Sequence, residues 1–106
     1  MAKYLITASY TAEGMNGVIS KGGTARRDAI SKMVADLGGS VESFHFAFGD
    51  EDAYVIVDLP ENVSAAAVGM AVGASGMAST KTVVLLTPAE IDRAAQNQAN
   101  YPAPGT

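Results

Sequence analysis

The sequence predicts an α+β domain in which two helices cover one face of a four-stranded antiparallel sheet. Stretches with the two-residue alternation of strands and stretches with helical spacing follow one another in the order strand, helix, strand, strand, helix, strand. Only a short acidic turn separates the second and third strands, so they form an antiparallel hairpin. Right-handed crossovers then place both helices on the same side of the sheet.

The first half of the chain predicts one strand and one helix. Residues 3–10 alternate, and the set that ends at Tyr10 points toward the core. Residues 11–23 are expected to form a connection, because glycines interrupt them. Thr24 is the expected N-cap of a helix with apolar residues three and four positions apart, and two glycines after residue 37 end it.

The second half predicts the hairpin, a second helix and a fourth strand. Residues 41–48 and 53–59 are the hairpin strands, and three phenylalanines of the first lie on its core face. Asn62 or Ser64 is the expected cap of a helix of small residues that runs to about residue 74. Residues 80–86 form the last strand, which completes a ferredoxin-like βαββαβ arrangement.

A C-terminal helix is the clearest local prediction. In TPAE, residues 87–90, a threonine N-cap precedes proline at the first helical position and glutamate at the third. We expect a single domain over residues 1–99 and a C-terminal tail over residues 100–106 that lies on a neighbouring molecule.

Composition narrows the classes of function. With 106 residues, 48% of them apolar, the chain can form a core without disulfides. The absence of cysteine excludes thiolate metal sites and cysteine nucleophiles and agrees with a cytoplasmic location. A net charge of −4 without a basic stripe argues against nucleic acid. The uncharged residues 62–80 are too small and polar to span a membrane, and no secretory signal is expected.

One face of the predicted sheet has no cover. Leu5, Ile56 or Val55, and Val83 or Val84 would leave apolar area exposed on a monomer. We therefore expect a homodimer or a higher homo-oligomer, in which two sheets pack face to face as a dimeric α/β barrel with a pocket on the sheet face.

Several segments together resemble the GYD domain family over almost the whole chain. They are KYLITASYTAEG, FHFAFGDEDAYVIVDLPENVSAAA, ASGMASTKTVVLLTPAEID and the helix start GGTARRDAI. The resemblance implies a dimeric α/β-barrel fold and no settled reaction, since the family is of unknown function. The family's glycine, tyrosine and aspartate fall on Gly49, Glu51 and Asp52, so Glu51 stands in place of the tyrosine.

His45 is the first candidate for catalysis. It points away from the phenylalanines, toward the expected barrel interior, where an imidazole can act as a general acid or base. Asp52 and Tyr10 are its candidate catalytic partners, and a hydrogen-bonded wall residue is the alternative interpretation of His45. The candidate ligand-binding residues on the same face are Lys3, Thr7 and Ser9. With one histidine, no metal site is predicted, and no cofactor either.

The acidic and glycine-rich segments are weaker candidates. The acidic residues 50–52 are interpreted as a turn, since they lack the ligand spacing of a calcium loop. A phosphate-binding loop is rejected because Gly23 stands where lysine is required. Arg26 and Arg27, beside the amides of a helix start, can hold an anionic ligand or belong to a plain surface.

The sequence leaves the enzyme question open. We expect an oligomeric small-molecule-binding protein or a cofactor-independent enzyme. The alternative is a structural or regulatory oligomer without catalysis.

Overall fold

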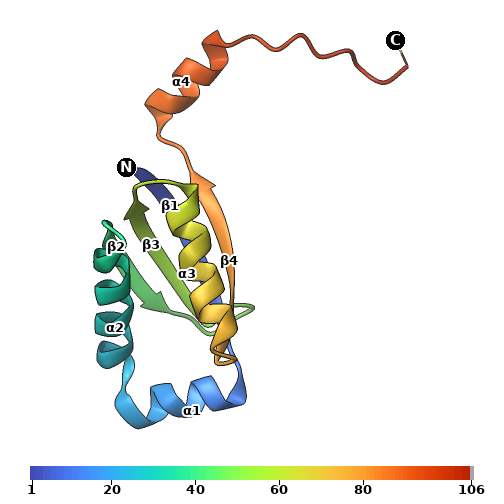
Figure 1. Cartoon of the computed structure of the whole chain (residues 1–106). Helices are drawn as coiled ribbons and strands as arrows, with labels where there is room; N and C mark the ends of the chain where they lie inside the picture. Colours follow the sequence, from blue (N-terminus) through green and yellow to red (C-terminus); the bar gives the residue numbers. More distant parts are fainter. Residues whose placement is uncertain (106) are drawn as a thin grey trace.

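The computed structural model describes residues 1–105 and confirms the α+β class. Four strands form one antiparallel sheet in the order β2-β3-β1-β4, and α2 and α3 cover one of its faces (Figure 1). Among the described residues, no helix has both the length and the apolar content that crossing a bilayer requires. The elements are β1 (Ala2–Tyr10), α1 (Ala12–Lys21), α2 (Gly23–Asp36), β2 (Ser40–Phe46), β3 (Ala53–Leu59), α3 (Asn62–Ala74), β4 (Ala78–Leu85) and α4 (Pro88–Gln96).

The core lies between the sheet and the two covering helices. The predicted alternation of β1 is confirmed, because Tyr4 and Ile6 are buried on the helix side. Alternate residues of β3 are buried beside them, and Val34 of α2 and Val68 of α3 complete the cluster. The β1 and β3 strands are central, so burying every second residue of each places the core under both helices.

The prediction for residues 11–23 was wrong, because they contain helix α1. Thr11 caps this helix by accepting a hydrogen bond from the backbone N–H of Gly14 at 3.1 Å. Gly22, with φ of 90°, ends α1 and also stands at the N-cap of α2, the place predicted for Thr24. Glycine weakens helices locally, but Gly14 is used for packing: a Cβ there would collide with the carbonyl of Met77.

Two other boundaries also differ from the prediction. The N-cap of α3 is Glu61, while Asn62 is the first helical residue and its Oδ1 accepts a hydrogen bond of 2.7 Å from the Tyr4 hydroxyl. Strand β2 ends at Phe46, and the side chain of Phe48 lies fully exposed in the following loop. At Asn62 a contact with a residue far away in the chain outweighs the local pattern.

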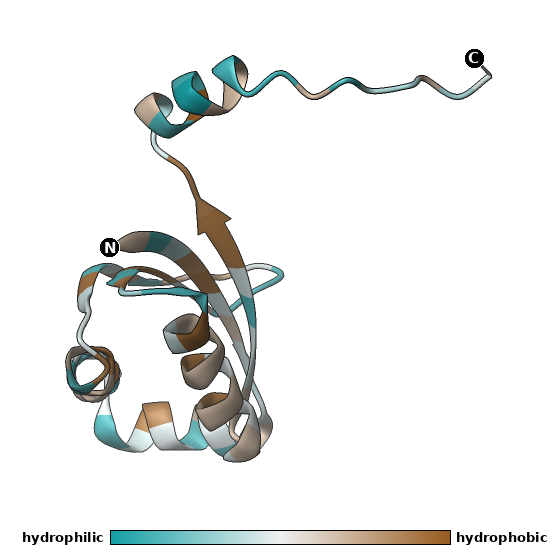
Figure 2. Cartoon of the chain, turned by 45° about the horizontal axis from the view of Figure 1, so that its top comes forward, coloured by the Kyte–Doolittle hydropathy of each residue, from teal (hydrophilic) through white to brown (hydrophobic). Residues whose placement is uncertain are grey.

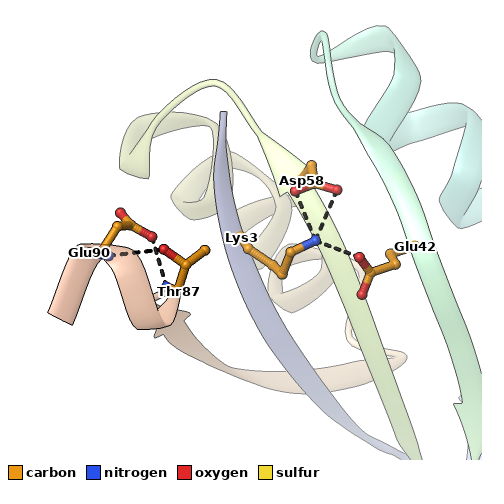
Figure 3. A network of polar contacts seen from close by, with 5 residues as sticks. All are labelled: Lys3, Glu42, Asp58, Thr87 and Glu90. Carbon is orange, nitrogen blue, oxygen red and sulfur yellow. Dashed lines mark hydrogen bonds and ion pairs between the residues drawn. The ribbon is translucent and has the colours of Figure 1, made fainter. Parts of the chain in front are cut away.

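The predicted C-terminal helix is confirmed as α4. Thr87 and Glu90 form a reciprocal capping box, with bonds of 2.9 and 3.1 Å between side chain and backbone (Figure 3). The backbone N–H of Thr87 bonds the Glu90 carboxylate and lowers its pKa. None of the residues of α4 is buried, and the helix stands clear of the sheet (Figure 1).

Candidate functional site

A cavity of about 610 Å³ lies between the helix-covered face of the sheet and the three helices α1, α2 and α3. Residues of all three helices line it. Figure 2 shows α2 and α3 facing each other across the space below the sheet, with α1 running between their ends. Its wall is formed mainly by apolar side chains, among them Ile6, Ile30, Phe44, Val55, Val68 and Val72. Cavities of this size enclose ligands of a few hundred daltons.

The ionisable groups of the cavity gather at the end formed by α1. Tyr10 comes from the end of β1, Glu13 and Lys21 from α1, and Arg26 from the first turns of α2. Among the lining residues two cationic side chains stand against one carboxylate, and the carboxylate of Asp52 lies close enough to act on the Tyr10 hydroxyl. The guanidinium of Arg26 can bind an anionic group at this end, while the opposite walls favour an apolar body.

Tyr10 presents a neutral phenol to this end of the cavity. Burial raises the pKa of its hydroxyl above 10.0, Arg26 partly offsets that rise, and the carboxylate of Asp52 adds to it. At neutral pH the hydroxyl keeps its proton and can donate a hydrogen bond. Tyr10 is thus the candidate catalytic residue that lines the cavity.

Asp52 fastens the loop between β2 and β3 to β1. Its carboxylate accepts a hydrogen bond of 2.8 Å from the backbone N–H of Tyr10. Its own N–H donates to the carbonyl of Ala8, also at 2.8 Å. This pair of bonds gives Asp52 a positioning role at the end of the strand that carries Tyr10.

Glu51 makes a second fastening on the open face of the sheet, the face without helices. It accepts a hydrogen bond of 2.5 Å from the Ser9 hydroxyl and forms an ion pair of 2.9 Å with Lys81. The bond from Ser9, followed by the one from Lys81, lowers the pKa of Glu51. The residue in place of the signature tyrosine therefore joins the loop to β1 and β4.

Lys3 and Thr7 occupy other parts of the open face. The Lys3 ammonium contacts the carboxylates of Glu42 at 2.6 Å and Asp58 at 3.1 Å (Figure 3). The hydrogen bond to Glu42, then the one to Asp58, raises the pKa of Lys3. Thr7 is buried between its strand neighbours Tyr54 and Lys81.

His45 lies exposed on the open side of β2, opposite Tyr54 of β3. It makes no side-chain hydrogen bond or ion pair within residues 1–105 and does not line the cavity. In this single chain the imidazole therefore faces solvent, and its enclosure in a barrel depends on a second copy.

The predicted site residues thus fall in separate places. Tyr10 and Arg26 meet at the cavity, His45 lies on the other face, and Arg27 turns outward to the carboxylate of Asp28 at 3.1 Å. No group of three histidine, aspartate or glutamate side chains in the described part of the chain is arranged to hold a metal ion.

The sequence interpretation missed the contribution of α1 to the cavity wall. Gly14, Gly17, Val18 and Lys21 line the cavity from one side of this helix. Their spacing of three and four residues was the available signal. It was obscured because two of the four are glycines, which lower helix propensity.

Comparison with known proteins identifies the family. The profile of the GYD domain matches residues 4–95, which is most of the 106-residue chain. No curated protein and no solved structure matches it. The match covers β1 from Tyr4 onward, the other three strands, α1 to α3 and nearly all of α4. The chain belongs to the GYD domain family.

Proposed function

We propose that this protein binds a small amphipathic acid in the cavity between its sheet and its helices. The observation that carries the proposal is the division of the cavity wall: it is apolar along the sheet and the covering helices, with Tyr10, Glu13, Lys21 and Arg26 at one end. An apolar body releases water when it enters such a wall. Its acid group would meet Arg26 and the Tyr10 hydroxyl.

The affinity of the proposed site depends on both parts of the ligand. Burial of apolar area contributes about 25 cal/mol per Å², so the ring system or chain supplies most of the binding free energy. A charge-assisted hydrogen bond from Arg26 adds about 1.5–3 kcal/mol and orients the acid. A neutral ligand of the same shape should bind more weakly.

A cofactor-independent enzyme is the second candidate, and Tyr10 favours it. A neutral phenol inside an apolar cavity can donate its proton to a carbonyl or enolate oxygen of the ligand. Proton transfer on an enolisable substrate would then occur at Tyr10, with Asp52 holding the backbone behind it. His45 could take part only if an oligomer enclosed the open face.

The test compares two adjacent arginines with two related fluorescent probes. Anilinonaphthalene sulfonate carries an apolar ring system and an anionic group, and phenylnaphthylamine has the same rings without the anion. Arg26→Gln should weaken sulfonate binding by about tenfold or more, because a charge-assisted bond is lost. It should leave phenylnaphthylamine binding nearly unchanged.

Arg27→Gln is the matched control, because Arg27 is the next residue of α2 and bonds Asp28 outside the cavity. It should bind both probes as the wild type does. His45→Ala tests the open face in the same titration. The proposal fails if neither probe saturates the wild-type protein, or if Arg26→Gln and Arg27→Gln have equal effects. A loss of binding in His45→Ala alone would move the site to the open face.

A further inference from the structure

Three charged side chains of the cavity wall have no partner of opposite charge in the described part of the chain. Glu13 and Lys21 of α1 and Arg26 of α2 line the end formed by α1, and none of them makes a side-chain hydrogen bond or an ion pair within residues 1–105. The lysines and arginines of the sheet and of the rest of α2 each contact a carboxylate; they are Lys3, Arg27, Lys32 and Lys81. Unpaired charges of both signs therefore meet at this cavity.

The spacing of Glu13 and Lys21 keeps these two side chains apart. They are eight residues apart on the cavity side of α1, which is about 12 Å along the helix axis. An ion pair along a helix needs a spacing of three or four residues, and the position four residues from both is Gly17. A Cβ at Gly17 would meet nothing within 4 Å, so the space between the two charges is open. A group of the ligand has room where an intrahelical partner would otherwise stand.

Helix stability accounts for only part of this arrangement. Glu13 lies in the first turn of α1 and Lys21 in its last turn, where each complements the helix dipole. The same argument does not explain Arg26 in the first turns of α2, because cations stabilise the C-terminal end of a helix and not the N-terminal end. A ligand that needs a cation at this place does explain it.

A ligand with a single charge would leave part of this end unsatisfied. An acid can bind Arg26, but its negative charge then lies at the same end of the cavity as Glu13. An amine can bind Glu13, but it then faces the cations Lys21 and Arg26. Like charges repel more strongly beside apolar walls than in water, because the local dielectric is lower. A ligand that carries both charges gives each of these side chains a partner.

We infer that the ligand is a zwitterion with an apolar body, of the class of α-amino acids with large apolar side chains. This inference rests on the function proposed above and names the ligand class of the same cavity. The carboxylate of the ligand binds Arg26 and the Tyr10 hydroxyl, and its ammonium group binds Glu13. Its side chain packs along the apolar wall that includes Phe44 and Val72.

Three indole compounds test the ligand class in the full-length protein. Tryptophan carries both charges, indole-3-propionate carries only the carboxylate, and tryptamine carries only the ammonium group. The chain contains no tryptophan, so the fluorescence anisotropy of the indole reports the ligand alone. Tryptophan should bind the wild-type protein about threefold more tightly than either analogue, or better.

Two variants assign the two charges of the ligand. Glu13→Gln should weaken tryptophan binding by about three- to fivefold and should not weaken indole-3-propionate binding. Arg26→Gln should weaken both by about tenfold and leave tryptamine binding nearly unchanged. Glu61→Gln is the matched control, because it removes the same charge outside the cavity, at the N-cap of α3, where the side chain makes no cap bond. It should bind all three compounds as the wild type does.

The outcomes separate this inference from the proposed function. Equal binding of tryptophan and indole-3-propionate by the wild type would overturn the inference and leave the acid site in place. So would equal effects of Glu13→Gln and Glu61→Gln on tryptophan binding, with circular dichroism verifying the fold of both. Tryptophan that does not bind although anilinonaphthalene sulfonate does would also overturn the inference. If neither the sulfonate nor any indole compound binds, the proposed function fails as well.

Discussion

The two faces of the sheet differ in how they use side chains from the same strands. On the helix-covered face, apolar residues surround a cavity with a few polar groups at one end. On the open face, Leu5, Ile56 and Val83 lie side by side between two groups of paired charges, Lys3 with Glu42 and Asp58 at one end and Lys81 with Glu51 at the other. The first face thus holds a cavity, whereas the second has paired charges at both of its ends.

At the end of β1, neighbouring residues serve the two different faces of the sheet. Tyr10 faces the cavity, and its neighbour Ser9 faces the other way and bonds Glu51. Because successive side chains of a strand point to opposite faces, one strand end can position a ligand-facing phenol and a loop-fastening hydroxyl at once. The loop between β2 and β3 is therefore bonded to both residues: Glu51 accepts from the Ser9 hydroxyl, and Asp52 accepts from the backbone N–H of Tyr10.

The largest loss of stability is expected from a substitution at Gly14, where α1 packs closely against Met77. Gly14→Ala should lower the free energy of unfolding by about 3 kcal/mol, because the new methyl group collides with the carbonyl of Met77. Gly17→Ala on the same helix meets nothing within 4 Å and should raise stability by about 0.5–1 kcal/mol. Urea unfolding of both variants measures the difference, and equal effects would contradict the packing role of Gly14.

A smaller loss of stability is expected when the hydroxyl of Tyr4, on the helix-covered face, is removed, and almost none when that of Tyr54, on the open face, is removed. Tyr4→Phe removes the bond to Asn62 and should cost about 1 kcal/mol of unfolding free energy. Tyr54→Phe, on the open face and 39% exposed, should change stability by less than about 0.5 kcal/mol. Thermal unfolding of the pair checks this, and a larger loss in Tyr54→Phe would mean that the open face is covered by another molecule.

The smallest expected effect is a pH dependence of stability that comes from Glu51, which bonds Ser9 and Lys81 on the open face. The pKa of Glu51 is lower in the folded chain than its ordinary value of 4.5. The stability that it contributes is therefore present above pH 4.5 and is lost as the pH falls below that value. Glu51→Gln should lower Tm near neutral pH but flatten its further decrease in acid.

Glu90→Gln is the control for this pH series. The pKa of Glu90 is also lowered, but Glu90 caps a helix that has no buried residue, so its loss should leave the melting of the domain unchanged. If the two variants show the same acid profile, Glu51 does not fasten the loop.

Local sequence alone determined the elements whose signals are complete within a few residues. The alternation of β3 gave its bounds, Ala53–Leu59, and the TPAE segment gave the capping box of α4, because both depend on neighbours along the chain. The family, too, was identified from sequence segments.

Tertiary structure decided what depends on residues far apart in the chain. Helix α1 exists despite its glycines because one of them allows the approach to Met77, and Asn62 leaves its expected cap position to bond Tyr4. For the same reason, spacing along the chain could not predict that Tyr10 and Arg26 line one cavity while His45 lies on the other face of the sheet. Each residue comes from a different element, and only packing brings such elements together.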